Sequence, residues 1–589
     1  MSSMASLTPA ILKAMPLEAL PGLADDIRRF LLESISDTGG HIGANLGTVE
    51  LTIALHYVFD SPTDAIFWDT GHQGYTHKLI TGRASLFPSL NTRGGMNRFV
   101  SCLESEHDAM EASHAGTSLS MALGMALARR MQGQSGWAIP VIGDGALCEG
   151  VALEALNHIS MEPDVRVAMV LNDNGYAISP GFGALHNYLQ GRPLGVEEPE
   201  TVFTSLGYDV IGPVDGHDIS ALVDAFRRVR EGDRTAIVHV KTEKGRGFSP
   251  ADTHPVKMHF SFPFDIETGS LKEVAATRCY QDVAAEAVGE IMETDASVAA
   301  ITPSTLYATG LTPIFERHAS RCFDPGMEEQ HAMTMAAGLA KAGATPVVFY
   351  QSTFMQRAFD QLFHDVCFAN TPMLLMAVRS GFAGYDNPTH HGIYDLSYLQ
   401  CLPNLRVLYP KDGYELRAMV LRHLPALEGP TLILMPYGPL DEFDASVLDE
   451  PAQSLDTPEV VSRGKDVLLI TVGNKFAAAK EAVAGLHDAG VDAGLINVRQ
   501  VKPLPVSSLM AEIAGYSRIV TIEEAVLDGG FGSAVSAMLH DQGISSELLR
   551  IGLPCTFVEP GSNEELCDTY GLTGAGIVER IMKKWANDE

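Results

Sequence analysis

Two polar residues, Asp144 and Asn174, each follow a short apolar segment and stand 30 residues apart. Asp144 lies in IGDG (142–145) and Asn174 lies in LNDN (171–174). One carboxylate and one amide at this spacing do not suit acid–base work, but both present hard oxygen atoms, which Mg²⁺ or Ca²⁺ prefer and zinc does not. Gly143 and Gly145 allow a ligand to approach the backbone closely. The pattern predicts a site for a divalent cation that carries a phosphate.

The apolar segments before these residues, WAIPV (137–141) and VRVAMVL (165–171), are predicted to be strands of a parallel sheet. Ligand sites in such sheets form beyond the carboxyl ends of the strands, so Asp144 and Asn174 are expected to meet there. The intervening helix is predicted to place Val151, Ala155 and Ile159 on one face.

Three segments of the chain alternate short apolar strands with amphipathic helices, which predicts an α/β fold with three domains. We expect each domain to have a mostly parallel sheet flanked by helices, over residues 1–272, 273–445 and 462–589. An acidic stretch with Pro and Ser, residues 441–461, is predicted to be a linker.

Composition limits the partners and the cellular location expected for the protein. The formal net charge of −32 disfavours nucleic acid and anionic membrane as partners, because both attract clustered Lys and Arg. The eight cysteines form no CxxC pair, which indicates reduced thiols and a cytoplasmic location. No apolar run is long enough to span a membrane, and the N-terminus lacks the order of a secretion signal.

Eight further motifs occur in an order that resembles the 1-deoxy-D-xylulose-5-phosphate synthase family of the transketolase superfamily. They are GGHIGANLGTVELTIALHYVFD (39–60), FWDTGHQGYTHKLITGR (67–83), GPVDGHD (212–218), EKGRGFSP (243–250), EEQHAMTMAAGLA (328–340), STFMQRAFDQLFHDV (352–366), GIYDLSYL (392–399) and VRQVKPL (498–504). The resemblance covers nearly all of residues 35–535. It implies a homodimer that uses thiamine diphosphate and Mg²⁺ to decarboxylate pyruvate and join the two-carbon unit to an aldehyde.

The resemblance also assigns residues to the cofactor. Mg²⁺ would be held by Asp144, Asn174 and the carbonyl of Tyr176. The other residues implied in cofactor binding are His72, Ser113, His114, Ala115, Gly145, Ala146, Lys244 and Phe248 in the first domain, and Phe354 and Arg357 in the second.

Four residues are implied in catalysis: Glu329, His41, His259 and His390. Glu329 matches the acid that supplies a proton to the cofactor's pyrimidine ring, and its apolar surroundings are expected to raise its pKa. From the residues alone Glu328 and Glu329 are indistinguishable, and only the resemblance selects Glu329. Arg379 and Asp386 match positions that contact substrate, and His391 stands where the family usually has Gln.

Three departures from the family pattern concern the acceptor. LMPYG (434–438) replaces a segment close to RYPRG, so Tyr437 stands where an Arg is expected to grip the acceptor phosphate. Gln351 replaces a Tyr near the substrate. The segment after the metal motif, PGFGALHNYLQGRPLGVEEPETVF (180–203), lacks several dozen residues of an expected flap. These departures predict an unchanged first half-reaction and a different aldehyde acceptor.

Three alternatives stay open on the sequence: a transketolase that moves a glycolaldehyde unit between sugars, an oxidative decarboxylase like that of pyruvate dehydrogenase, and a thiamine diphosphate-binding protein without catalysis. The segments KGRGFSP (244–250) and DNPTHH (386–391) match the synthase better than the transketolase. The acceptor itself is not fixed by the sequence.

Overall fold

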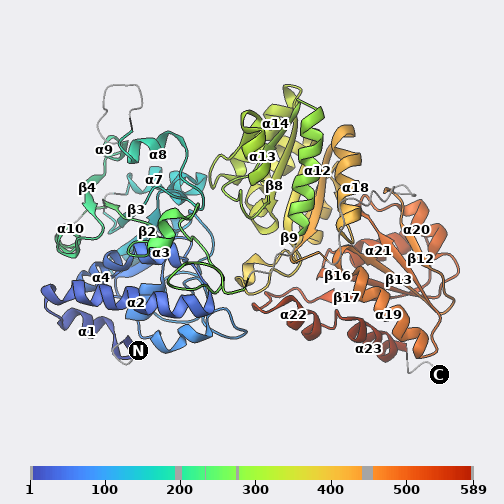
Figure 1. Cartoon of the computed structure of the whole chain (residues 1–589), viewed down its shortest axis with the longest axis horizontal. Coiled ribbons are helices and arrows are strands. Elements are labelled where there is room, and N and C mark those ends of the chain that lie inside the picture. Colours follow the sequence, from blue (N-terminus) through green and yellow to red (C-terminus); the bar gives the residue numbers. More distant parts are fainter. Residues whose placement is uncertain are drawn as a thin grey trace. The chain divides into compact units, whose positions relative to one another are not determined.

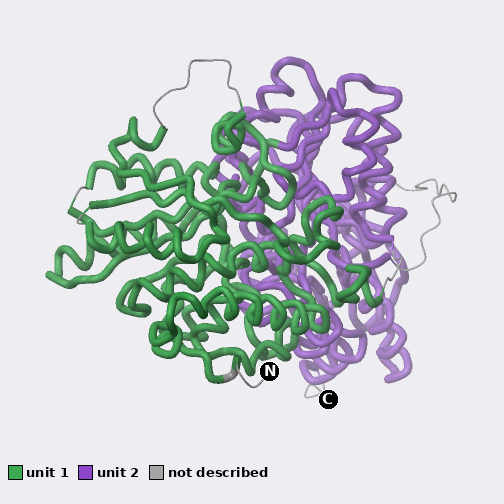
Figure 2. Tube along the Cα trace, turned by 60° about the vertical axis from the view of Figure 1, so that its left-hand side comes forward, with its two compact units in different colours: residues 1–275, 325–328 green, residues 276–324, 329–589 purple. Residues whose placement is uncertain are grey.

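The computed structural model describes residues 4–162, 164–192, 202–232, 234–273, 278–440 and 455–585. The chain divides into two units (Figure 2). Unit 1 contains Met1–Ala275 and Pro325–Glu328, and unit 2 contains Ala276–Asp324 and Glu329–Glu589. Apart from Pro325–Glu328 and the residues before Ala276, the predicted second and third domains therefore lie in one unit.

The core of unit 1 is a parallel sheet of five strands in the order β1-β2-β3-β5-β4 (Figure 1). Its strands are β1 (Ala65–Trp68), β2 (Ala138–Gly143), β3 (Ala168–Asp173), β4 (Asp209–Asp215) and β5 (Ala236–Lys241). Every residue of β3 is buried, as expected for a strand covered on both faces, and β2 and β3 are neighbours, as predicted.

The helices of unit 1 begin and end as follows: α1 (Pro9–Ala14), α2 (Leu20–Thr38), α3 (Ile42–Gly47), α4 (Val49–Val58), α5 (Tyr75–Ile80), α6 (Ser118–Gln132), α7 (Gly150–Ile159), α8 (Gly183–Leu189), α9 (Val202–Ser205), α10 (Ile219–Glu231) and α11 (Ser249–Thr253). Helix α7 follows the GDG turn, as predicted. Ala155 and Ile159 are buried, but Val151 is only partly buried, because the core face of α7 passes through Ala152 and Leu156 instead.

Unit 2 contains two sheets. The first has the order β15-β10-β11-β9-β8-β6-β7 and is parallel except where β15 pairs with β10. Its strands are β6 (Val298–Ile301), β7 (Cys322–Phe323), β8 (Thr345–Gln351), β9 (Met373–Ser380), β10 (Arg406–Leu408), β11 (Pro430–Pro436) and β15 (Gln500–Lys502). Since β15 comes from the predicted third domain, that domain adds a strand to the sheet of the second.

The second sheet of unit 2 has the order β12-β14-β13-β16-β17, with β12 antiparallel. Its strands are β12 (Glu459–Ser462), β13 (Val467–Val472), β14 (Ala493–Val498), β16 (Arg518–Val526) and β17 (Glu547–Leu553). Strand β12 begins inside the predicted linker, so the last residues of that stretch belong to a sheet. Residues 441–454 of the linker lie outside the described residues.

The helices of unit 2 are α12 (Tyr280–Thr294), α13 (Thr312–Arg317), α14 (Glu329–Lys341), α15 (Ser352–Met355), α16 (Phe359–Gln361), α17 (Asp395–Tyr398), α18 (Gly413–His423), α19 (Phe476–Asp488), α20 (Val506–Ile513), α21 (Phe531–Asp541), α22 (Asn563–Thr569) and α23 (Gly574–Trp585). Helix α14 packs on β8, and α19 packs on α23 and β14. Three mostly parallel sheets flanked by helices confirm the predicted α/β class. Within the described ranges no helix is both long and apolar enough to cross a membrane.

Candidate active site

The turns after β2 and β3 bring Asp144 and Asn174 together, as the strand order requires. The backbone N–H of Gly175 donates to Asp144 Oδ2 at 3.1 Å, and the N–H of Tyr176 donates to Asn174 Oδ1 at 3.0 Å. Gly175 has a φ of +76°, which allows the tight turn that carries Tyr176. All three predicted metal ligands therefore lie in two adjacent turns of unit 1.

Asp144 is buried, and its Oδ1 atom has no hydrogen-bond partner among the described residues. Burial raises the pKa of Asp144 to about 7, and the nearby Asp173 carboxylate adds to this increase. A buried acceptor without a partner costs about 1–3 kcal/mol, which a bound cation would offset. A Cβ atom added at Gly145 would lie 2.7 Å from Ala177 Cβ, so the backbone at Gly145 and Ala146 approaches this turn closely. The oxygen ligands and the close turn fit a divalent cation.

Lys244 belongs to the same region of unit 1. Its ammonium group donates to the carbonyls of Ala177 at 3.1 Å and Ile178 at 3.4 Å, and it lies 5.1 Å from the ring of Tyr176. Burial lowers the pKa of Lys244 to about 7, and Asp144 partly opposes this shift. Phe248, which the resemblance places on the same rim, is buried with its ring 5.6 Å from that of Phe264.

Three predicted histidines, His41, His72 and His259, form a ring cluster with centroid distances of 5.1–5.5 Å. Burial lowers the pKa of His72 to about 3 and that of His259 well below its usual range, so both are neutral near pH 7. Neutral imidazoles keep one donor and one acceptor nitrogen each. His72 and His259 can therefore both donate a hydrogen bond to a bound substrate and accept one from it.

Asn45 holds two of these histidines and was missed by sequence reasoning. Its Nδ2 donates to the carbonyls of His41 at 2.6 Å and His72 at 2.7 Å, while Oδ1 accepts from the N–H of Tyr75 at 2.7 Å. Asn45 is fully buried. The signal available in the sequence is an Asn inside the apolar segment that follows His41, where a buried amide needs several partners.

The segment with Ser113, His114 and Ala115 is attached to the end of β1. Asp69 accepts from the N–H of Gly116 at 2.8 Å and from that of Ser118 at 3.0 Å. Ser113 has a φ of +93°, an uncommon value for a residue other than glycine. His114 is exposed and Ser113 and Ala115 are partly buried, so this turn presents its side chains at the surface of unit 1.

A small pocket in unit 1 adjoins the metal motif. It is lined by Asp144, Gly145, Cys148, Ala177, Gly181, Phe182, His186 and Pro325–Glu328. His186 of α8 is buried with its Nδ1 atom 4.0 Å from Asp144 Oδ2, and Gly181 leaves the space that its ring fills. Sequence reasoning missed His186, which belongs to the short segment after the metal motif. Residues 193–201 of that segment lie outside the described residues.

Unit 2 brings together four other predicted residues. Glu329 is buried at the start of α14, with its Oε2 atom 4.0 Å from Arg357 Nε. The Tyr350 hydroxyl donates to the Glu329 carbonyl at 2.9 Å, which fixes the first turn of α14 on β8. The ring of Phe354, which is partly buried, lies 5.7 Å from that of His390 in an edge-to-face arrangement.

The structure separates Glu328 from Glu329, which the sequence did not. Glu328 is partly buried and lines the small pocket of unit 1, where it contributes to a raised pKa of Cys148. Glu329 is buried within unit 2 beside Arg357. Adjacent residues therefore face different surroundings, and Glu329 has the buried position that a proton-holding acid needs.

The residues predicted to contact the substrate surround Arg379, which has a φ of +69°. Its Nη1 donates to Gln351 Oε1 at 3.0 Å, and its Nη2 donates to Asp386 Oδ2 at 2.9 Å and to the Ala383 carbonyl at 3.1 Å. The ring of Tyr437 lies 4.6 Å from the guanidinium carbon. Both departures from the family pattern, Gln351 and Tyr437, thus contact the same arginine.

His391 supports the loop that carries Arg379 and Asp386. Its Nδ1 atom accepts from the N–H of Ala383 at 2.9 Å, and burial lowers the pKa of His391 to about 4. The ring is fully buried. His391 therefore holds the loop that carries Arg379 and Asp386, a role that its substitution for Gln did not reveal.

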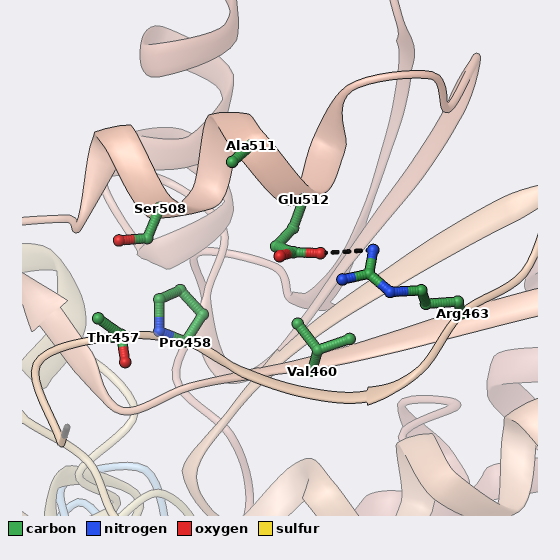
Figure 3. Close-up of a pocket in the computed structure, with 7 residues that line it drawn as sticks. All are labelled: Thr457, Pro458, Val460, Arg463, Ser508, Ala511 and Glu512. Atoms are coloured by element: carbon green, nitrogen blue, oxygen red, sulfur yellow. Dashed lines mark ion pairs between the residues drawn. The ribbon is translucent and has the colours of Figure 1, made fainter. Parts of the chain in front are cut away.

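A surface pocket of about 400 Å³ lies elsewhere in unit 2 (Figure 3). It is lined by Thr457, Pro458, Val460, Arg463, Ser508, Ala511 and Glu512. Arg463 pairs with Glu512 at 2.8 Å, so its charge is already partnered. None of the predicted site residues is among those that line it, and we do not assign it to catalysis.

Comparison with known proteins identifies the family of the chain. Residues 5–193 and 192–242 match the family described as 1-deoxy-D-xylulose-5-phosphate synthase. Residues 277–440 match the transketolase pyrimidine binding domain, and residues 457–577 match the transketolase C-terminal domain.

The chain is 40% identical over 615 residues to 1-deoxy-D-xylulose-5-phosphate synthase 1 of Geobacter sulfurreducens, covering 97% of this chain and 95% of that protein. It is 40% identical over 618 residues to the 1-deoxy-D-xylulose-5-phosphate synthase of Geobacillus thermodenitrificans, covering 97% of each. Among solved structures, the transketolase of Campylobacter jejuni matches at 15% identity and a TM-score of 0.45, covering 97% of this chain and 100% of that one.

Proposed function

The chain belongs to the 1-deoxy-D-xylulose-5-phosphate synthase family, and we propose that it decarboxylates pyruvate with thiamine diphosphate and transfers the two-carbon unit to an aldehyde. It is a transketolase-type transferase. The observation that carries the cofactor assignment is the buried Asp144 carboxylate, whose Oδ1 atom has no partner among the described residues and lies beside Asn174 and a close glycine turn.

When bound, thiamine diphosphate supplies an electron sink that permits loss of carbon dioxide from a 2-oxo acid. Asp144, Asn174 and the Tyr176 carbonyl would hold Mg²⁺ against its diphosphate, with Lys244 nearby as a cation. Glu329 would hold a proton for the pyrimidine ring, and Phe354 would support that ring by stacking. Arg357, 4.0 Å from Glu329, would orient the carboxyl group.

The histidines near the reacting carbon would donate hydrogen bonds to the substrate and accept them from it. His41, His72 and His259 lie in one cluster of unit 1, and Asn45 fixes the backbone at the first two. His390 of unit 2 lies beside Phe354. A fixed neutral imidazole with one donor and one acceptor nitrogen can orient pyruvate and donate a hydrogen bond to the oxygen of the aldehyde.

We further propose that the acceptor differs from that of a phosphate-gripping synthase. Arg379 already donates to Gln351, Asp386 and Ala383, and the ring of Tyr437 covers it. A phosphate would have to compete with these contacts, and the second arginine expected at position 437 is absent. A charge-assisted arginine–phosphate contact contributes about 1.5–3 kcal/mol, so a phosphorylated aldehyde should bind at least about tenfold less tightly.

Several finer points belong to the same proposal. Mg²⁺ is the proposed cation, and the family resemblance supports a homodimer and three domains over residues 1–272, 273–445 and 462–589. The eight cysteines are all free thiols, which supports a reducing, cytoplasmic location. Sedimentation of the loaded protein tests the dimer.

One experiment tests the central proposal: pyruvate with a panel of phosphorylated and free aldehydes, with carbon dioxide release and product mass as readouts. Pyruvate-dependent release and a 1-deoxyketose product support the synthase. Transfer from a ketose phosphate donor without pyruvate would favour the transketolase alternative. Binding of thiamine diphosphate with no turnover on any pair would favour the non-catalytic alternative.

A further inference from the structure

We propose that the C-terminal domain positions the acceptor-binding arginine through a clamp on the loop that carries it. The acceptor loop is residues 379–391, and the C-terminal clamp is Glu524, Gly561, Asn563 and Glu565. The clamp residues come from β16 and from α22 with the turn before it. The proposal rests on the proposed function, because it assigns these residues to the acceptor half of the reaction.

The strongest contact of the clamp joins Tyr385 to Glu565. The Tyr385 hydroxyl donates to Glu565 Oε2 at 2.6 Å. The same carboxylate oxygen accepts from the N–H of Ser562 at 2.8 Å in the capping box of α22, which fixes its position. Tyr385 is directly followed by Asp386, the partner of Arg379. By holding Tyr385, Glu565 therefore also fixes the position of the carboxylate that binds the guanidinium.

A second contact comes from Glu524 on β16. Its Oε1 atom accepts from the N–H of Phe382 at 2.8 Å, and its Oε2 atom pairs with Lys475 at 2.5 Å. Gly381 has a φ of +88°, and a Cβ there would lie 2.3 Å from Glu524 Oε1. The acceptor loop therefore follows the surface of the buried Glu524–Lys475 pair at a distance that only glycine permits.

Two weaker contacts complete the clamp. Asn563 Nδ2 donates to the Tyr437 carbonyl at 3.2 Å, and the N–H of Gly561 donates to the Gly384 carbonyl at 3.4 Å. Tyr437 is the residue whose ring covers Arg379. All four contacts thus end within one or two residues of a group that touches the arginine.

This convergence explains how Arg379 is held in an uncommon backbone conformation, with a φ of +69°. Such conformations persist where the surroundings fix them, and they concentrate at ligand sites. The four clamp contacts end at Phe382, Gly384, Tyr385 and Tyr437, and none of them includes Glu329. Loosening the clamp should therefore affect the acceptor step more than pyruvate decarboxylation, because the clamp contacts end at residues 382–385 and 437 and not at His390, which lies at the far end of the loop.

The test uses the full-length protein loaded with thiamine diphosphate and Mg²⁺. Three variants are made, Glu565→Gln, Tyr385→Phe and the double variant that combines them, and each is compared with the control variant Glu564→Gln. Glu564 is the exposed neighbour in the first turn of α22 and serves as the matched control. The readouts are the KM and kcat for the best aldehyde of the panel, carbon dioxide release from pyruvate, and hydrogen exchange over residues 379–391 without any substrate.

We expect each single variant to raise the aldehyde KM by about tenfold, with little change in kcat or in pyruvate decarboxylation, because a hydrogen bond to a charged group is lost. The double variant should be no worse than the singles, and Glu564→Gln should match the unmodified protein. Faster hydrogen exchange over 379–391 should accompany the two clamp variants.

Additive effects of Glu565→Gln and Tyr385→Phe, or unchanged exchange over 379–391, would overturn the clamp. Equal losses of pyruvate decarboxylation and aldehyde use would also overturn it, since they would indicate a general structural defect. If the unmodified protein turns over no pyruvate, the proposed function fails, while the hydrogen-exchange comparison still decides whether the clamp exists.

Discussion

The turn at Asp144 in unit 1 and the loop at Arg379 in unit 2 differ in how fully they pair an ionisable side chain with hydrogen-bond partners. Asp144 is buried with its Oδ1 atom lacking a partner within the described residues. Arg379 has protein acceptors on both Nη atoms, an aromatic ring against its face, and only Nε without a partner in the described part of the chain. The first side chain keeps a carboxylate oxygen without a partner among the described residues, whereas the charge of the second is largely paired within the chain itself.

This difference indicates which half of the chemistry is retained. A buried carboxylate oxygen without a partner, such as Asp144 Oδ1, is costly, which favours a ligand that offsets the cost. A guanidinium that is already paired can bind a phosphate only by exchanging contacts, which leaves a smaller net gain. Four changes test the comparison, from the largest expected effect to the smallest.

Replacing Glu329 tests whether unit 2 supplies the acid that holds a proton for the pyrimidine ring of the cofactor. Glu329→Gln should slow proton exchange at the reactive carbon of bound thiamine diphosphate by about 10²- to 10⁴-fold, because an amide cannot hold the proton for the ring nitrogen. Proton NMR of the loaded protein measures it. Glu328→Gln is the matched control, and slow exchange in that variant instead would show that the other carboxylate is the acid.

Replacing Asp144 tests whether its burial serves a cation. Asp144→Ala should weaken Mg²⁺-dependent retention of thiamine diphosphate by at least about a hundredfold, since the diphosphate loses its bridging charge. Calorimetry with and without Mg²⁺ measures the loss. Without ligands the melting temperature of the variant should change little, because the unpartnered Oδ1 atom and the acceptor of the Gly175 N–H are removed together. Unchanged cofactor affinity would refute the metal assignment.

Replacing Tyr437 tests whether Arg379 is neutralised by its neighbours. Tyr437→Arg removes the covering ring and adds a second positive charge, so glyceraldehyde 3-phosphate should be used better by up to about 2 kcal/mol, or about thirtyfold in kcat/KM. Steady-state kinetics with the phosphorylated and free aldehydes measure it, and carbon dioxide release should not change. A low micromolar KM for the phosphorylated aldehyde in the unmodified protein would contradict the comparison.

Replacing His186 sharpens the description of the cation site. Its Nδ1 atom lies 4.0 Å from Asp144 Oδ2, and an imidazole nitrogen favours Ni²⁺ over Mg²⁺. His186→Ala should therefore lower Ni²⁺ affinity several-fold more than Mg²⁺ affinity in calorimetric titrations. His158→Ala, at an exposed position of α7, is the control. Equal changes for both ions would limit His186 to a packing role.

The sequence by itself determined the α/β class, the family and the meeting of Asp144 with Asn174. These follow from local patterns: buried strands read as continuous apolar runs, and parallel order places both turns at one edge of the sheet. It did not separate Glu328 from Glu329, because adjacent residues share their sequence context. It also missed Asn45, His186 and the clamp, since their partners lie far away in the chain.

Only the tertiary structure decided that Gln351 and Tyr437 both contact Arg379, because β8, β9 and β11 adjoin through strand order rather than sequence distance. Burial and hydrogen-bond partners are properties of the packed fold. They decide that Asp144 keeps an oxygen without a partner among the described residues, while Arg379 is already paired.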